Sequence, residues 1–196
     1  MLFNSFEFIF LFLPIVFFIY FYLNKKKLVT TSKIFLVLSS LFFYSWWNIV
    51  YLPLILLSMI FNFTIGKLIL KNKENEFLSK KRLLTIGIII NVSLLGYFKY
   101  ADFFIKNKNF FFNFEFAELK LALPLAISFF TLQQVAYLIE TFRGKIKENS
   151  FLNYGVFVTF FPQLISGPIV YHREIMGQFT LIKNKIINTD NISFGL

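Results

Sequence analysis

The longest uncharged stretch of the chain covers residues 34–66 and reads IFLVLSSLFFYSWWNIVYLPLILLSMIFNFTIG. As a single α-helix, these 33 residues would measure about 50 Å, whereas the hydrocarbon core of a bilayer is only about 30 Å thick. The centre of the stretch, residues 46–53, combines aromatic side chains that favour the membrane interface with a proline that suits the first turn of a new helix. The stretch therefore predicts two membrane helices joined by a tight turn near residues 48–52.

Further uncharged runs lie on both sides of this stretch, at residues 8–23, 83–98, 121–139 and 149–171. Each is long enough to form a span, with some help from flanking residues in the shortest. Pro162 and the pair Gly167-Pro168 interrupt the second half of the last run. The pattern predicts an all-α, polytopic integral membrane protein with about six transmembrane helices, one of them broken by Pro162 and Gly167-Pro168.

The composition agrees with a membrane class and argues against nucleic-acid binding. Of the 196 residues, 57% are hydrophobic and 15% are charged, and the mean hydropathy is +0.68; about a quarter of a soluble domain is charged. The net charge is +10, but the Lys and Arg residues stand at the ends of apolar runs, where they orient spans and meet lipid headgroups. We therefore expect the lipid bilayer, and no nucleic acid, as a partner.

The distribution of Lys and Arg predicts the orientation. With six spans and the N-terminus outside, 13 of the 20 basic residues fall in the segments 24–33, 67–82 and 140–150, which would be cytoplasmic. No basic residue precedes the first apolar run, so we expect a retained first helix and not a cleaved signal peptide. The predicted location is the inner (plasma) membrane.

Residues 102–120 differ from the spans. Phenylalanines alternate here with Lys, Asn and Glu, which makes the segment too polar to cross the hydrocarbon core. An aromatic and basic mixture is typical of the membrane interface, so we predict an interfacial segment at 102–120.

Few residues suggest chemistry. The chain has no cysteine and one histidine, His172, and no metal site is expected. A lone histidine can serve as a general base or proton relay, but a loop residue after the broken helix is the simpler interpretation. Glu140 and Arg143, one turn apart at the end of a span, are expected to form an ion pair that anchors the helix end.

Polar residues inside two apolar runs are the candidates for a substrate tunnel. The amides of Gln133 and Gln134 need partners in hydrocarbon, either as contacts between helices or as contacts to substrate. The second group surrounds the helix break, where freed backbone groups survive only inside protein or beside water; it comprises Pro162, Gln163, Ser166, Gly167 and Pro168. Its two interpretations, a tunnel wall and a kink that only shapes packing, remain open.

Six short segments together resemble one protein family. They are Met1-Leu2-Phe3-Asn4-Ser5, Phe43-Tyr44-Ser45-Trp46-Trp47, residues 96–103 (GYFKYADF), residues 123–130 (LPLAISFF), residues 137–144 (YLIETFRG) and residues 160–170 (FFPQLISGPIV). In order and spacing the set resembles the membrane-bound O-acyltransferases, and most closely their alginate and peptidoglycan O-acetyltransferase branch. The resemblance covers nearly the whole chain.

This resemblance implies an enzyme of about ten or more helices around a central tunnel. Such an enzyme moves an acyl group from a cytoplasmic acyl thioester to an acceptor polysaccharide outside, with no bound cofactor and with an extracytoplasmic acetyltransferase as partner. The family's catalytic histidine lies in a later helix, so His172 does not match it. We therefore expect residues 1–196 to be the N-terminal part of one membrane-embedded domain, inactive without the remaining C-terminal helices.

Two other functions fit the residues without the resemblance. A transporter or channel would also contain a discontinuous helix and amides inside the membrane. A non-catalytic membrane subunit would need neither a base nor a tunnel.

Overall fold

The computed structural model describes residues 3–72, 79–112, 116–147, 150–164, 167 and 171–187. The main helices in chain order are α1 (Leu13–Lys25), α2 (Val29–Trp47), α3 (Leu52–Lys71), α4 (Lys80–Phe112), α5 (Ile127–Phe142), α6 (Phe151–Thr159), α7 (Phe161–Leu164) and α8 (His172–Thr180). The π-helix η1 (Glu7–Phe12) precedes α1, and the 3-10 helices η2 (Ile49–Tyr51) and η3 (Ile182–Lys185) follow α2 and α8. Within these residues the regular secondary structure is helical, and no strand is formed.

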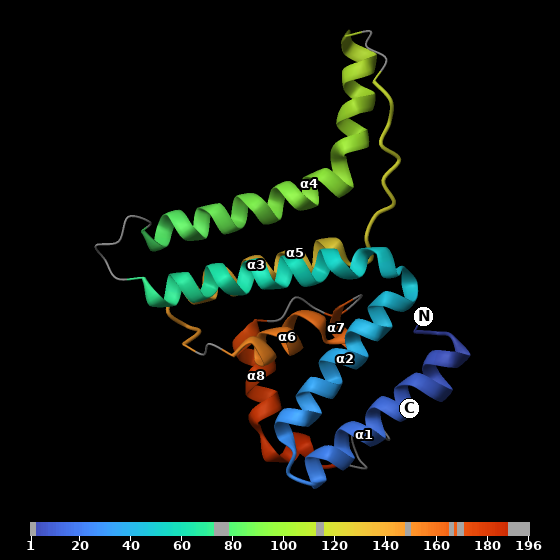
Figure 1. The fold of residues 1–196 in the computed structure, drawn as a ribbon, viewed down its shortest axis with the longest axis vertical. Helices are drawn as coiled ribbons and strands as arrows, with labels where there is room; N and C mark the ends of the chain where they lie inside the picture. Colours follow the sequence, from blue (N-terminus) through green and yellow to red (C-terminus); the bar gives the residue numbers. More distant parts are fainter. Residues whose placement is uncertain are drawn as a thin grey trace.

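Two helical groups enclose the short helix α6. Helices α3, α4 and α5 pack on one another side by side, while α1 and α2 form a second pair (Figure 1). Helix α6 contacts α2, α3, α5 and α8, and its residues Tyr154 to Thr159 are all buried. The centre of the molecule is therefore a nine-residue helix that precedes the predicted break.

The structure confirms that the stretch 34–66 forms two helices. Helix α2 ends at Trp47, and the backbone of Asn48 is extended. The side-chain oxygen of Asn48 accepts a hydrogen bond from the Val50 N–H at 3.0 Å. Helix α3 begins at Leu52 with Pro53 in its first turn. The turn is stable because the Asn48 side chain and the proline satisfy or remove donors that a helix start leaves unpaired.

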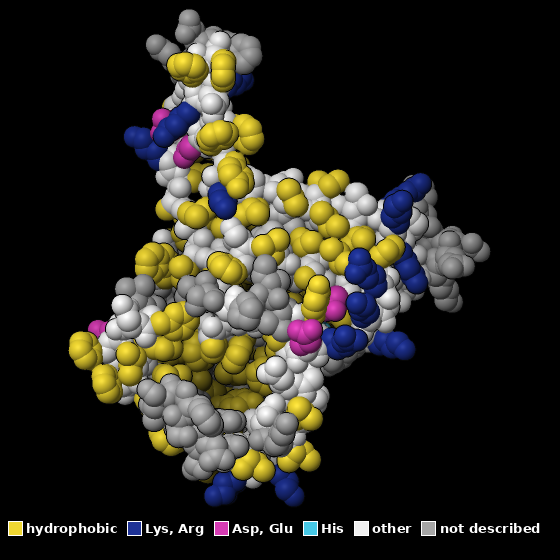
Figure 2. Space-filling model, turned by 180° about the vertical axis from the view of Figure 1, so that it is seen from behind, with side chains coloured by type: hydrophobic (Ala, Val, Ile, Leu, Met, Phe, Trp, Pro, Cys, Tyr) yellow, Lys and Arg dark blue, Asp and Glu magenta, His cyan; other side chains and the backbone are white. Residues whose placement is uncertain are grey.

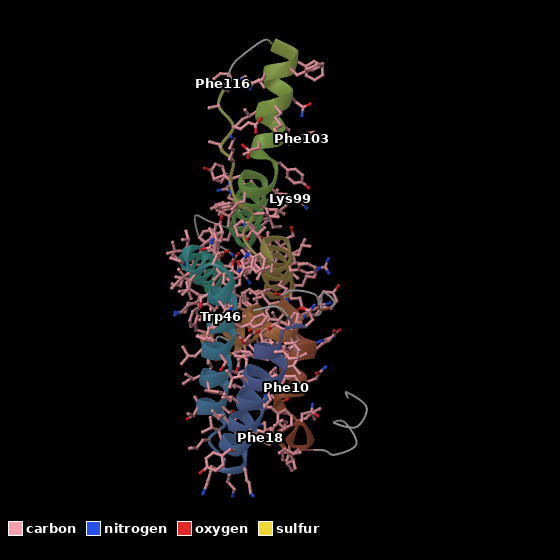
Figure 3. The ribbon with its side chains drawn as sticks, turned by 90° about the vertical axis from the view of Figure 1, so that its right-hand side faces the viewer. Phe10, Phe18, Trp46, Lys99, Phe103 and Phe116 are labelled. Atoms are coloured by element: carbon pink, nitrogen blue, oxygen red, sulfur yellow. The ribbon has the colours of Figure 1, made fainter. Side chains whose placement is uncertain are left out.

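Four helical segments in the described part of the chain are long and apolar enough to cross a membrane: Glu7–Lys25, Val29–Trp47, Ile49–Lys71 and Lys80–Phe111. They expose large apolar side chains such as Phe10, Phe18 and Trp46 (Figure 3). Most Lys and Arg gather at the end of the α3–α5 group and at the end of α1 (Figure 2). The molecule is thus a polytopic α-helical membrane protein. The count of six spans stays a prediction, since α5 has only 16 residues.

Two helix boundaries differ from the predicted ones. Helix α5 starts at Ile127 and not at residue 121, because Leu125 and Ala126 form a turn and Ala126 has a left-handed backbone (φ 57°), which a right-handed helix does not contain. Helix α4 does not stop where residues 102–120 were expected to become interfacial. It continues to Phe112, and Figure 1 shows it turning sharply in its last third.

Two glycines allow α5 to approach its neighbours closely. A Cβ atom on Gly66 of α3 would lie 2.7 Å from the Tyr137 ring, and one on Gly87 of α4 would lie 2.6 Å from a Leu138 methyl carbon. Both distances are shorter than real carbon contacts. Small residues at such crossings are the usual way in which membrane helices gain packing energy.

Candidate functional site

The break after α6 is built into the protein core. Phe160 leaves the helical region (φ −49°, ψ 105°), and α7 begins at the next residue with Pro162 in its first turn. The freed N–H of Phe161 donates to the Ser40 hydroxyl of α2 at 3.3 Å, and both residues are buried. A side chain from a neighbouring helix therefore satisfies the backbone that the break exposes, as membrane depth requires.

Gly167 lies directly against α7. The Gly167 N–H donates to the Gln163 carbonyl at 3.0 Å, and a Cβ atom on Gly167 would lie 2.7 Å from the Gln163 Cα. Only glycine permits this approach. Pro162 is exposed and Gln163 is buried. Ser166 and Pro168, the other predicted tunnel residues of this segment, lie outside the described residues.

A buried polar cluster joins α3, α4 and α5. Asn62 of α3 and Asn91 of α4 exchange side-chain hydrogen bonds of 3.1 and 2.6 Å. The Gln134 oxygen of α5 accepts hydrogen bonds from the Ser58 hydroxyl at 2.7 Å and from the Asn62 amide. Asn62 and Gln134 are completely buried. Gln134 was predicted either to connect helices or to contact substrate. Its hydrogen bonds show the contact between helices, and a role in a tunnel stays a prediction.

Gln133 points away from this cluster. At 100° per residue it shares a face of α5 with Tyr137 and with Glu140, seven residues on. The Tyr137 ring packs against Tyr154 of α6 and His172 of α8, with centroids 4.5 and 5.7 Å apart. This face of α5 is therefore directed toward α6 and α8. We call it the α5–α6 seam.

The seam contains polar atoms that lack partners. Within the described residues, Gln133 Oε1, Glu140 Oε2 and the Tyr154 hydroxyl are buried and accept or donate no hydrogen bond. Buried polar groups are normally paired, because an unpaired one costs about 1–3 kcal/mol. In the same part of the chain, one buried atom in each of Tyr44, Thr131 and Gln134 also lacks a partner. The seam is therefore one of several places where the interior is chemically incomplete, and the one that combines atoms of α5 and α6.

The ion pair expected between Glu140 and Arg143 is not formed. Glu140 is only 4% exposed, whereas Arg143 lies on the surface. The ion pair that the structure forms within the described residues joins Lys106 and Glu118 at 3.5 Å, far along the chain. The prediction was wrong because the α5 helix turns the carboxylate inward, into the seam, and the guanidinium outward.

His172 is not the loop residue that was expected. It begins α8 and is 5% exposed, and its ring lies 5.2 Å from that of Phe157 as well as against Tyr137. It shares a face of α8 with Ile175 and Met176, which are also buried. Burial lowers the pKa of His172 to about 4, because the aromatic surroundings disfavour the imidazolium. In its described surroundings His172 is a neutral packing residue at neutral pH.

Several site residues were missed by the sequence patterns. Ser58, Asn62, Asn91 and Tyr154 all lie inside uncharged runs. The signal was available for the two asparagines, since an amide within a span requires a partner. For Tyr154 there was none, because a tyrosine near the start of a run is equally typical of the membrane interface. Within the described residues, no group of three or more His, Asp and Glu could hold a metal ion.

These features define the class as a helical membrane protein with a broken, polar core, and comparison with known proteins narrows it. The chain is 45% identical to the peptidoglycan O-acetyltransferase of Helicobacter pylori, over 100% of this chain and 42% of that protein. It is 34% identical to the probable alginate O-acetylase AlgI of Azotobacter vinelandii and 32% identical to that of Pseudomonas aeruginosa, each over 91% of this chain and 36% or 34% of the relative. No family model and no solved structure matches the chain.

These relatives support the membrane-bound O-acyltransferase family that the residues of the chain resemble, because the similarity to peptidoglycan and alginate O-acetyltransferases extends along nearly all of this chain. The chain spans about two fifths of the length of the curated relatives it matches. These relatives do not favour the transporter or the non-catalytic subunit.

Proposed function

We propose that the protein containing this chain transfers acetyl groups to hydroxyls of a cell-envelope polysaccharide such as peptidoglycan or alginate. The observation that carries the proposal is the 45% identity along the whole chain to a peptidoglycan O-acetyltransferase. The acetyl donor would be a cytoplasmic acyl thioester. In the transfer the acceptor oxygen attacks the thioester carbonyl, the thiol leaves, and a general base takes the hydroxyl proton.

In this proposal residues 1–196 are the N-terminal part of one membrane-embedded domain. They supply scaffold and tunnel wall, and the base comes from a later helix. His172 is a poor base because its pKa is about 4 and aromatic rings pack against it. The tunnel would pass the α5–α6 seam and the break, using Gln133, Gln163 and Gly167 together with Gln134, Pro162, Ser166 and Pro168. Unpaired buried atoms at Gln133 and Tyr154 support this course, since they offer hydrogen bonds to an amide-bearing or hydroxyl-bearing ligand.

The proposed setting is the inner membrane, with the N-terminus outside and an extracytoplasmic acetyltransferase as partner. The basic residues at the ends of α1 and of the α3–α5 group support this orientation. The exposed turn at η2 would then face the outside.

Measurement of ester-linked acetate on isolated envelope polysaccharides tests the function. Deletion of the gene should lower the acetate content, and the complete coding sequence should restore it. Expression of residues 1–196 alone should not restore it, even when the fragment is present in the membrane. Unchanged acetate after deletion would refute acetyl transfer and return the transporter to consideration; restoration by the fragment would refute the need for later helices.

A further inference from the structure

The last third of α4 forms a projecting arm with the chain segment that follows it. The arm comprises residues 97–112 of α4 and the return segment 116–120. Asp102 accepts a hydrogen bond from the Leu119 N–H at 2.7 Å. Asn109 bonds to both the N–H and the carbonyl of Phe116, at 3.1 and 2.8 Å. With the Lys106–Glu118 pair, these contacts hold the return segment along one side of the helix.

The opposite side of the arm is aromatic. At 100° per residue, the side chains of Asp102, Lys106 and Asn109 point to the return segment. The exposed aromatic residues fall within an arc of roughly 140° on the other side, and they are Tyr97, Tyr100, Phe103, Phe104, Phe110 and Phe111, between 44% and 80% exposed. We call this surface the aromatic face. In Figure 3, Phe103 lies on the side of α4 away from Phe116.

The flanks and the polar content of the aromatic face indicate what covers it. Lys99 and Lys108 are exposed and border the arc on its two sides. The Lys108 ammonium lies 4.6 Å from the centre of the Phe116 ring on the return segment. Lys99 is therefore the border cation whose ammonium can reach phosphate while its stem lies on apolar surface. Asn107 lies within the arc, but its amide donates to the Phe103 carbonyl of its own helix at 2.7 Å. The face thus presents rings with cationic borders and little unsatisfied polarity. These are the features of a helix that lies in a lipid interface.

The course of α4 places the arm at the level of the membrane surface. A straight helix of 33 residues would be about 50 Å long, longer than the hydrocarbon core. One end of the α3–α5 group carries the Lys and Arg side chains seen in Figure 2. At the opposite end, α4 turns sharply away from the direction of α3 and α5 (Figure 1). Because the first part of α4 runs beside those helices across the bilayer, the turned part runs along the bilayer surface.

We propose that the arm is a membrane-surface anchor: its aromatic face inserts into the outer leaflet at the headgroup and acyl-chain boundary, Lys99 contacts lipid phosphates, and the return segment faces water. The occupant of the face is the phospholipid bilayer itself. This proposal does not depend on acetyl transfer.

Site-directed spin labelling tests the anchor, because residues 1–196 contain no native cysteine. The complete protein, with any cysteine outside residues 1–196 replaced by serine, would be reconstituted in nanodiscs of phosphatidylethanolamine and phosphatidylglycerol, with a label at Phe104→Cys or Phe111→Cys. Glu118→Cys on the return segment is the matched control. Collision with oxygen should exceed collision with a water-soluble nickel chelate at Phe104 and Phe111, and the reverse should hold at Glu118.

Equal access of the nickel chelate to all three positions would overturn the anchor. Protection of Phe104 and Phe111 from both reagents would also overturn it, because that result indicates a protein partner on the aromatic face. Phe104 and Phe111 are 66% and 73% exposed, so the labels replace no core contact and the fold is retained.

Discussion

At the scale of single residues, the adjacent buried amides Gln133 and Gln134 differ in the hydrogen bonds that their oxygens accept. Gln134 accepts two side-chain hydrogen bonds across helices, whereas Gln133 Oε1 accepts none within the described residues. Two neighbours of identical chemistry therefore form a matched pair, in which one substitution breaks a network and the other does not.

Gln134→Leu should lower the free energy of unfolding by about 1 kcal/mol, the usual value of an interhelical hydrogen bond in a membrane, because Ser58 loses its acceptor. Gln133→Leu should be neutral or slightly stabilising, because it removes an unpaired buried amide oxygen. Thermal unfolding of the two variants in detergent measures the difference. Greater damage from Gln133→Leu would contradict this view of the cluster.

His172 gives a prediction about pH. Its folded pKa of about 4 lies below the usual 6.5, so between these values the unfolded chain binds a proton that the folded chain does not. Stability should therefore be full above pH 6.5 and should fall as the pH drops toward 4, by on the order of 2 kcal/mol from this residue. Tyr137 is the titratable group packed on the ring, and Arg173 and Glu174 beside it are exposed.

The variant His172→Phe keeps an aromatic ring and removes the titration. Its stability should decline less than that of the parent between pH 6.5 and pH 4, while acetyl transfer by the complete protein at neutral pH stays within about tenfold, since loss of a general base typically costs 10²–10⁴-fold. Parallel acid-dependent loss in both proteins, or a thousandfold loss of transfer at normal membrane levels, would show that His172 does more than pack.

At the scale of helices, the approach of α3 to α5 depends on one missing side chain. Gly66→Ala would place a methyl group 2.7 Å from the Tyr137 ring, and that ring is already packed against Tyr154 and His172. We expect destabilisation of about 1–3 kcal/mol, as for other overpacked cores. Gly96→Ala in α4 is the control: no atom lies within 4 Å of the added carbon, so helix propensity should make it neutral or stabilising. An equal fall in the melting temperatures of the Gly66→Ala and Gly96→Ala variants would contradict the close approach of α3 to α5.

The helix boundaries show what a sequence can predict here. The division of residues 34–66 followed from length against bilayer thickness, and it was correct. The start of α5 was predicted too early, because Leu123-Pro124-Leu125 is apolar and a hydropathy pattern does not reveal that the backbone turns there. The burial of His172 was missed because α8 is polar in composition and hides only one narrow face. The partners of Gln134 depend on how α3, α4 and α5 dock, and no local pattern contains that information.

At the scale of the whole molecule, the basic ends of α1, α3 and α5 predict one cytoplasmic side. Single cysteines at Lys26 and Lys80 should resist a membrane-impermeant maleimide in intact cells, and Val50→Cys, in the exposed turn between α2 and α3, should react. All three positions should react after the membrane is opened. Labelling of a cysteine at position 26 or 80 in intact cells would contradict the predicted orientation.

The shortness of the central helices has a consequence for the membrane around them. Helix α5 has 16 residues and is about 24 Å long, and α6 is interrupted after nine residues. Both are shorter than the hydrocarbon thickness. Because α6 is enclosed by other helices, the depth that it leaves uncovered must be filled by protein or water and not by lipid. A reactant at the seam then has a shorter hydrocarbon path to cross than it would have along a full-length span.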